Sequence, residues 1–362
     1  MPDKKQKKLV LSASRIKTYQ SCSWKFYCEY KANEGVGLPK EGNDGMRRGN
    51  VCHNVLELIL AKNRREIAEL IVRKNSISAY KPVHALVKKY LEKEGALSQE
   101  NYDLCNSMII VALKNDFFGK GGRPDKPERE FTIENKNPYY VIRGFLDKVI
   151  KYTKDKKIKI VDYKTSKSKF KGDDLTSNIQ AMAYVLASKK QLYKSYKDVL
   201  VEFLFLKFGK SPSEQVSFTD EEIEGFEYHL ADIYKKIDEF DENAAVSNFA
   251  YHKPYPKDGS FGGPVSCGYA KYKGELKVDG TVKWHCDFKF PYDYYAIIDE
   301  QGKVLKTSLK KEALSPKANQ SIEKKHYEGC PVHNPFSEED FPSCGESKKK
   351  SLEEQSEEDF NF

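Results

Sequence analysis

The chain has 362 residues, of which 32% are charged, and a formal net charge of +8. This length allows one large domain or two smaller ones with a buried core, and it excludes disorder as the main state. The charge is uneven: residues 336–362 carry nine acidic and three basic side chains, which leaves residues 1–335 at about +14. A basic body favours a polyanionic partner, and nucleic acid is the first candidate.

Targeting and membrane signals are weak. The apolar run at residues 9–11 is too short for the core of a signal peptide. No stretch approaches the roughly 18 apolar residues of a membrane span. We therefore predict a cytoplasmic protein, in the host cytoplasm if phage-encoded, that does not bind a membrane.

Helical periodicity dominates the first part of the chain. Residues 11–30 begin with serines that can cap a helix. The segment predicts a short helix followed by an aromatic-rich turn. Apolar residues at helical spacing predict two long helical segments, at residues 45–75 and 82–117. We therefore expect a helical region before the first strand.

From about residue 128 the periodicity changes to that of strands. Strand patterns cover residues 129–134, 139–152 and 157–164, and residues 154–157 are expected to form the turn between the last two. The later elements are a helix at 175–191, strands at 198–208 and 214–218, and an amphipathic helix at 219–242. Residues 245–335 are rich in Gly, Pro and Tyr and are expected to be rich in loops.

Two aspartates and a lysine are predicted to meet on the hairpin of residues 139–164. In a strand, residues i and i+2 project from the same face about 6.6 Å apart, so Asp162 and Lys164 point together. The neighbouring strand would bring Asp147 alongside them. Unpaired charges are costly in a core, so the group either forms an exposed salt bridge or holds a divalent cation. Mg²⁺ prefers such oxygen ligands.

Two helical pairs add polar groups to this picture. Gln180 and Tyr184 stand at i and i+4 on the helix that follows the hairpin, so they share one face. His53 and Glu57 have the same spacing on an earlier helix. Each pair alone is typical of ordinary surface or structural side chains, but their occurrence together with the aspartates favours a site.

The ordered series of these residues resembles a known family. His53, the segment Gly144-Phe-Leu-Asp147, the triplet Asp162-Tyr-Lys164 and the pair Gln180-x-x-x-Tyr184 are similar to the motifs of the RecB-like exonucleases. These form a branch of the PD-(D/E)XK nuclease superfamily that includes the nuclease domains of RecB and AddB and the CRISPR-adaptation exonucleases. The similarity runs from about residue 10 to residue 240.

The resemblance implies an α/β fold with a restriction-endonuclease-like core, in which helices flank a central mixed sheet. It also implies hydrolysis of DNA phosphodiesters with Mg²⁺ or Mn²⁺. Its metal ligands would be His53, Asp147, Asp162 and the carbonyl of Tyr163. Many relatives have Glu at the position of Asp162, but the superfamily pattern admits either residue.

The resemblance also assigns three residues near the scissile bond. Lys164 would position the attacking water or stabilise charge on the phosphate. Gln180 and Tyr184 would contact the DNA there.

The cysteines suggest a second metal site. Cys22 follows a Ser-x-Ser helix and resembles the family element that joins three C-terminal cysteines around a [4Fe–4S] cluster. The resemblance implies a cluster on Cys22, Cys267, Cys286 and Cys330. However, the usual close Cys-x-x-Cys spacing is missing, because a predicted hairpin at residues 271–284 separates Cys267 from Cys286.

Two alternatives for these cysteines remain open. His333 follows Cys330 at a spacing typical of zinc ligands, so Cys267, Cys286, Cys330 and His333 could hold Zn²⁺ instead. The other alternative is that no metal binds here. The remaining cysteines are expected to be small core residues at positions 28, 52 and 105 and a tail residue at position 344.

The chain is expected to divide into five parts. These are an N-terminal element with a possible cluster ligand at 1–35, a helical region carrying His53 at 36–124, a nuclease core at 125–244, a Cys/His/Tyr-rich region at 245–335 and a disordered acidic tail at 336–362. A solvating role is the simplest explanation of the tail. Its acidic and aromatic end resembles tips that recruit replication and recombination proteins.

The leading functional prediction is a DNA exonuclease of recombination, repair or phage replication. It would act on single-stranded DNA or on the ends of duplex DNA. The alternatives are a catalytically silent DNA-binding or scaffolding module and a structure-specific endonuclease. No motif residue is missing, which argues against the silent module.

Overall fold

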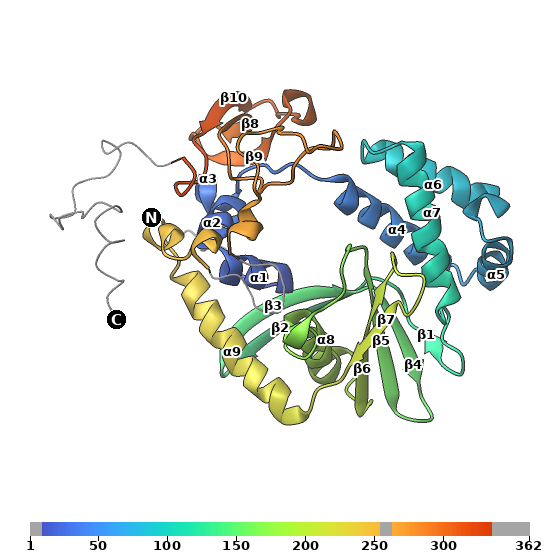
Figure 1. Cartoon of the computed structure of the whole chain (residues 1–362). Coiled ribbons are helices and arrows are strands. Elements are labelled where there is room, and N and C mark those ends of the chain that lie inside the picture. Colours follow the sequence, from blue (N-terminus) through green and yellow to red (C-terminus); the bar gives the residue numbers. More distant parts are fainter. Residues whose placement is uncertain (1–8, 254–262, 335–362) are drawn as a thin grey trace, which may run out of the picture.

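The computed structural model describes residues 9–253 and 263–334 (Figure 1). The acidic tail and Cys344 lie outside these residues. The N-terminal helices are α1 (Ala13–Ser21), α2 (Ser23–Tyr30) and the single turn α3 (Ala32–Gly35). The helical region consists of α4 (Asp44–Ala61), α5 (Arg65–Lys74), α6 (Lys81–Lys93) and α7 (Gln99–Lys114).

Each of the predicted long helical segments is in fact two helices. The segment predicted at residues 45–75 breaks between α4 and α5. The C-cap residue of α5, Asn75, has the left-handed conformation that often ends a helix. The second breaks between α6 and α7, where Ser98 caps α7 by accepting a hydrogen bond from the N–H of Asn101. Local capping therefore sets the helix boundaries that hydrophobic periodicity alone did not show.

A five-stranded mixed sheet forms the centre of the molecule. Its order is β1-β4-β5-β6-β7, in which β5 and β6 are parallel and the other neighbours are antiparallel. The strands are β1 (Arg123–Pro124), β4 (Lys148–Tyr152), β5 (Lys157–Lys164), β6 (Asp198–Phe205) and β7 (Ser213–Val216). Helix α8 (Ile179–Ala187), extended by a π-helical turn at Ser188–Leu192, crosses from β5 to β6.

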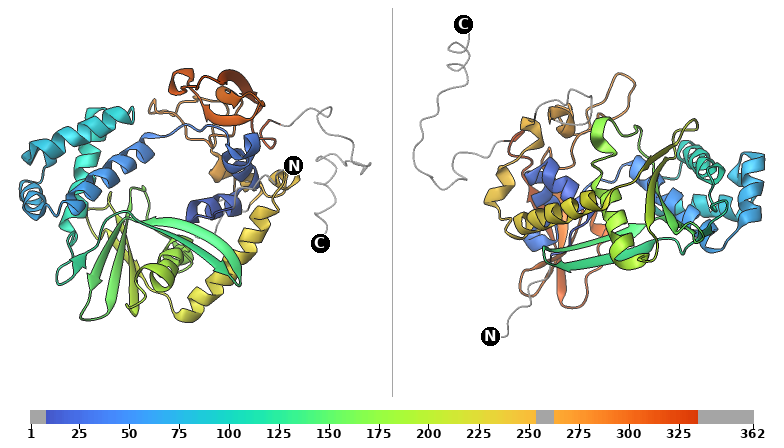
Figure 2. Two further views of the ribbon diagram at one scale, coloured as in Figure 1. Left: turned by 180° about the vertical axis from the view of Figure 1, so that it is seen from behind. Right: turned by 90° about the horizontal axis from the view of Figure 1, so that it is seen from below.

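The predicted strand at residues 139–152 is divided. Strand β3 (Tyr139–Leu146) pairs with β2 (Arg129–Lys136) in a separate two-stranded ribbon, and β4 begins at Lys148. Asp147 lies at the bend between the two. Figure 2 shows this ribbon curving away from the central sheet towards α9 (Asp220–Asp238).

Successive side chains of β5 point alternately into two hydrophobic cores, one on each face of the sheet. Ile158 and Ile160 belong to the larger core, which also contains α8 and α9, whereas Val161 and Tyr163 pack against the helical region. Asp162 is therefore directed to the α8 face, among apolar side chains. This burial requires polar partners for its carboxylate.

The C-terminal region contains a three-stranded antiparallel sheet that the sequence patterns did not predict. Its order is β10-β8-β9, formed by β8 (Tyr292–Asp299), β9 (Val304–Ser308) and β10 (Gln320–Tyr327). The indole N–H of Trp24 donates to the Tyr327 hydroxyl at 2.8 Å, which joins this sheet to α2. The two ends of the described chain therefore pack together, as Figure 1 shows.

No helix among the described residues is long and apolar enough to cross a membrane.

Candidate active site

The predicted site residues reach one region from four elements. Asp162 and Lys164 stand at the end of β5, and Asp147 lies at the adjoining bend before β4. Gln180 and Tyr184 project from α8 and His53 from α4. All six line a single cleft of about 2060 Å³. The cleft also extends along α1, the β2–β3 ribbon and α9.

Asp162 is the centre of a buried polar network. Its Oδ1 accepts hydrogen bonds from the Tyr184 hydroxyl at 2.8 Å and from Nε2 of Gln180 at 2.9 Å. Its Oδ2 lies 2.6 Å from Nζ of Lys164. Lys164 also donates to Oε1 of Gln180 at 2.7 Å. The i, i+4 pair on α8 thus orients both the carboxylate and the ammonium group.

One carboxylate oxygen of this network is available to accept a further hydrogen bond or to bind a cation. Asp162 is 3% exposed, and its Oδ2 receives no well-directed hydrogen bond within the described chain despite the close lysine. Burial raises the pKa of Asp162, Lys164 lowers it, and Asp147 raises it again, with a net upward shift. A cation at this oxygen would favour the ionised carboxylate.

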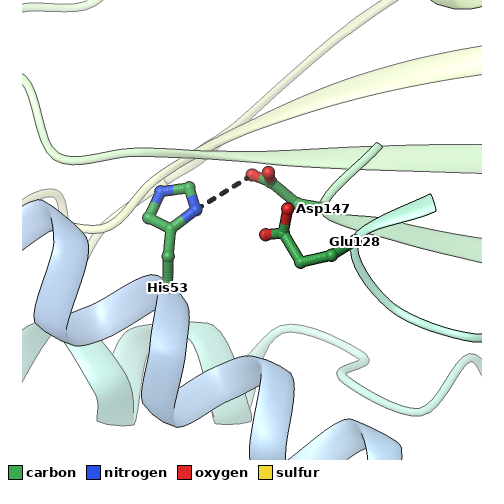
Figure 3. Close-up of side chains that lie close together, drawn as sticks. All are labelled: His53, Glu128 and Asp147. Atoms are coloured by element: carbon green, nitrogen blue, oxygen red, sulfur yellow. Dashed lines mark ion pairs between the residues drawn. The ribbon is translucent and has the colours of Figure 1, made fainter. Parts of the chain in front are cut away.

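His53, Glu128 and Asp147 form a second, adjoining group (Figure 3). One ligand atom from each lies within 4.8 Å of the others. Within the described ranges, no other set of three or more His, Cys, Asp or Glu meets this spacing. Nδ1 of His53 is 3.4 Å from Oδ2 of Asp147, which also accepts a hydrogen bond from the N–H of Tyr163 at 2.9 Å.

Both nitrogens of His53 face acceptors. Its Nε2 lies 3.1 Å from the carbonyl oxygen of Tyr163, and its Nδ1 faces Asp147. Burial lowers the pKa of His53, but Asp147, Asp162 and Glu128 outweigh burial and raise it to about 9. Positive charge is therefore favoured between these groups.

The donor set suits a hard divalent cation. Neighbouring ligand atoms of an octahedral Mg²⁺ lie roughly 3 Å apart, given metal–oxygen distances of about 2.1 Å. The 3.1 Å between His53 Nε2 and the Tyr163 carbonyl oxygen is close to that spacing. Imidazole with carboxylates also suits Mn²⁺.

The sequence patterns missed Glu128. It lies just before β2, and its N–H donates to the carbonyl of Asp147 at 3.3 Å, which extends the β2–β3 ladder by one step. Burial and Asp147 raise the pKa of Glu128 to about 7. Pairing of residue 129 with residue 146 in a hairpin would have placed Glu128 beside Asp147. The sequence patterns predicted the two strands but not their pairing.

Comparison with known families decides the assignment. A family model described as the PD-(D/E)XK nuclease superfamily matches residues 10–269, which is more than half of the chain. The chain belongs to the PD-(D/E)XK nuclease superfamily. Its mixed sheet flanked by helices is the restriction-endonuclease-like core that the resemblance implied.

Other comparisons add little to this nuclease assignment. No curated protein matches the chain. Among solved structures, one named "Putative exonuclease" from Eubacterium rectale has 12% sequence identity and a TM-score of 0.39 and covers 67% of this chain and 85% of its own. This likeness is too weak to support an argument.

The cysteines of the nuclease gather in a separate region. Cys22 is the N-cap of α2, and the N–H of Cys286 donates to the carbonyl of Cys267 at 3.0 Å. Burial, with smaller contributions from Cys22, Cys267 and Cys286, raises the pKa of Cys330 to about 12. Burial likewise raises the pKa of Cys267 to about 11, with contributions from Cys286 and Cys22. The four thiols therefore interact electrostatically.

The residues of the alternative zinc set do not form a compact set of three ligands among the described residues. Sulfur ligands of one tetrahedral Zn²⁺ lie roughly 3.8 Å apart, given Zn–S distances of about 2.3 Å. Cys267, Cys286, Cys330 and His333 do not meet even the 4.8 Å spacing among the described residues. A cubane cluster separates its cysteine sulfurs more widely because four iron atoms lie between them.

The other cysteines of the described chain are core residues. Cys28, Cys52 and Cys105 are fully buried, as predicted. Cys28 lies close enough to the thiol group that Cys286, Cys330 and Cys22 contribute to its raised pKa, after burial as the main cause.

Proposed function

We propose that this nuclease is a Mg²⁺- or Mn²⁺-dependent DNA exonuclease of the RecB-like branch, acting in recombination, repair or phage replication. The observation that carries the proposal is the buried network of Asp162, Lys164, Gln180 and Tyr184 beside the His53–Asp147 pair. The Gln-x-x-x-Tyr element distinguishes the RecB-like branch, and here its two side chains orient the central carboxylate.

In this proposal His53, Asp147, Asp162 and the Tyr163 carbonyl hold the metal, and Glu128 joins them as a further ligand. When bound, the metal would supply Lewis acidity, which lowers the pKa of a water molecule and offsets negative charge on the phosphate. Asp147 holds the backbone of Tyr163 in place through the hydrogen bond to its N–H. Asp147 and the Tyr163 carbonyl are therefore held relative to each other before a substrate arrives.

Lys164 supplies the positive charge that faces the substrate phosphate. Its ammonium group is held by Asp162 and Gln180, so it is already oriented when DNA binds. Tyr184 is buried and acts by holding Asp162, whereas Gln180 is only partly buried and can also contact DNA.

We propose a [4Fe–4S] cluster on Cys22, Cys267, Cys286 and Cys330. The mutual electrostatic influence of the thiols supports this set, because it includes Cys22, which the alternative Zn²⁺ set of Cys267, Cys286, Cys330 and His333 lacks. The cluster would tie α2 to the C-terminal region across more than 200 residues of chain. We retain as predictions the cytoplasmic location, the five domain boundaries and the recruitment of a replication or recombination protein by residues 336–362.

The test is cleavage of end-labelled linear DNA and of circular single-stranded DNA, with Mg²⁺, with Mn²⁺ and with EDTA. We expect metal-dependent release of short products from linear DNA and no attack on the circle. Digestion of the circle would instead support an endonuclease. Binding without cleavage under every metal condition would support the silent module.

A further inference from the structure

We propose that Phe145 is a stacking platform for a base of single-stranded DNA beside the metal ligands. This inference rests on the proposed nuclease function and adds to it a substrate class and a positioning residue. Phe145 is 43% exposed. Among the exposed large apolar side chains of the described residues, it is the one that lines the cleft.

The β2–β3 register places Phe145 two residues along the ladder from Asp147. Phe145 pairs with Glu130, the next pair is Leu146 with Arg129, and the N–H of Glu128 donates to the carbonyl of Asp147 one step beyond that. Two residues along a strand span about 6.6–6.8 Å and return to the same face. A base on Phe145 would therefore belong to a nucleotide close to the phosphate at the metal.

Neighbouring side chains fix the position of the ring. The guanidinium of Arg143 lies 5.2 Å from the centre of the Phe145 ring. Nε of Arg143 is 2.7 Å from Oε1 of Glu130, so its charge is already paired. Arg143 thus supports the ring more than it attracts phosphate, and the rest of the exposed ring is available to a base.

The charge of the cleft indicates that base stacking contributes to its affinity for DNA. Its lining contains six Lys or Arg and six Asp or Glu residues, so it has no excess of positive charge over its whole length. A strand held there needs contacts other than ion pairs. Base–aromatic stacking supplies about 1–3 kcal/mol per base without sequence preference.

Stacking on Phe145 also selects the substrate. In a duplex, both faces of an internal base are covered by neighbouring bases, so away from the duplex end a protein ring can stack only on an unpaired base. We therefore expect single-stranded DNA, or a frayed end, to be the species that reaches the metal ligands.

The test uses oligodeoxythymidylate with 2-aminopurine at successive positions from one end, bound in EDTA so that no cleavage occurs. Wild type should quench the fluorescence at one position, and Phe145→Ala should remove that quench and weaken binding about tenfold. Phe145→Tyr should retain both properties. Tyr228→Ala removes an exposed aromatic side chain of α9 outside the cleft and should match wild type.

The outcomes separate this inference from the proposed function. If wild type cleaves single-stranded DNA but Phe145→Ala binds and cleaves it equally well, the stacking role is wrong and the nuclease stands. Equal wild-type cleavage of blunt duplex and single-stranded DNA would also overturn the substrate class. Absence of metal-dependent cleavage by wild type, with quenching intact, would contradict the nuclease proposal alone.

Discussion

The molecule contains two groups of potential metal ligands with opposite surroundings. His53, Glu128 and Asp147 are partly buried carboxylate and imidazole groups, of which His53 and Asp147 line a large cleft. Cys267 and Cys330 are buried thiols, and Cys330 belongs to the core that contains aromatic side chains of α2 and the C-terminal sheet. The first group borders the cleft, and the second connects distant parts of the chain.

This difference indicates that the first group would serve catalysis and the second would serve the stability of the fold. A hydrolytic metal needs a position open to water and phosphate, which the cleft provides. The proposed cluster on the second group would lie among largely buried side chains, so its effect would be to hold segments together. Substitutions in the first group should therefore lower the cleavage rate and leave the stability nearly unchanged. Substitutions in the second group should lower the stability and leave the cleavage rate nearly unchanged.

The largest effect is expected from Lys164→Gln. This change removes the positive charge but keeps a donor for Asp162, so the fold should remain while the rate falls about 10²–10³-fold. Single-turnover cleavage of linear DNA and circular dichroism measure the two properties. Lys167→Ala, an exposed lysine nearby, is the matched control. Wild-type cleavage by Lys164→Gln would show that the catalytic group has been misassigned.

Glu128→Gln tests whether the additional carboxylate belongs to the metal group. We expect affinity for Mn²⁺ to fall about 10–100-fold and cleavage to recover partly at high metal concentration. Calorimetric titration of Mn²⁺ provides the measurement. Glu130→Gln removes a neighbouring carboxylate outside the group and should leave Mn²⁺ affinity unchanged. Equal affinities for wild type and Glu128→Gln would place Glu128 outside the site.

Cys22→Ser tests the architectural group. Anaerobically purified wild type should be brown, and the variant should lose its iron and its visible absorbance. Loss of a crosslink over a long loop typically costs about 2–4 kcal/mol, so the thermal midpoint should fall by roughly 5–10 °C.

The matched control for Cys22→Ser is Cys105→Ala, a buried cysteine of the helical region, which should keep the iron. Mn²⁺ affinity at the catalytic group should be similar in all three proteins. A colourless, metal-free wild type of normal stability would rule out the cluster.

The smallest effect is expected from Lys17→Ala. Lys17 is exposed on α1 at the lining of the cleft, where it can contact one phosphate. Its removal should reduce the slope of log Kd against log salt concentration by about 0.7 for single-stranded DNA. Lys62→Ala, an exposed lysine outside the cleft, should leave the slope unchanged. A similar slope for both variants would mean that α1 does not contact the backbone.

The sequence by itself determined the elements that carry the chemistry. Alternation in β5 placed Asp162 and Lys164 on one face, and helical spacing placed Gln180 and Tyr184 together on α8. These relations are local, because they depend only on the repeat of a strand or a helix. The order of the same residues along the chain was also enough to suggest the superfamily that the family comparison confirmed.

Only the tertiary structure decided which distant groups meet. Glu128 joins His53 and Asp147 because β2 pairs with β3 in one particular register, and no local pattern near residue 128 specifies that partner. The same holds for Phe145, whose exposure in the cleft depends on the curved ribbon and on α1 opposite it. The strands β8, β9 and β10 likewise escaped prediction because they pack against α2 from the other end of the chain. Pairing and packing between remote segments depend on the whole fold, so short-range periodicity cannot reveal them.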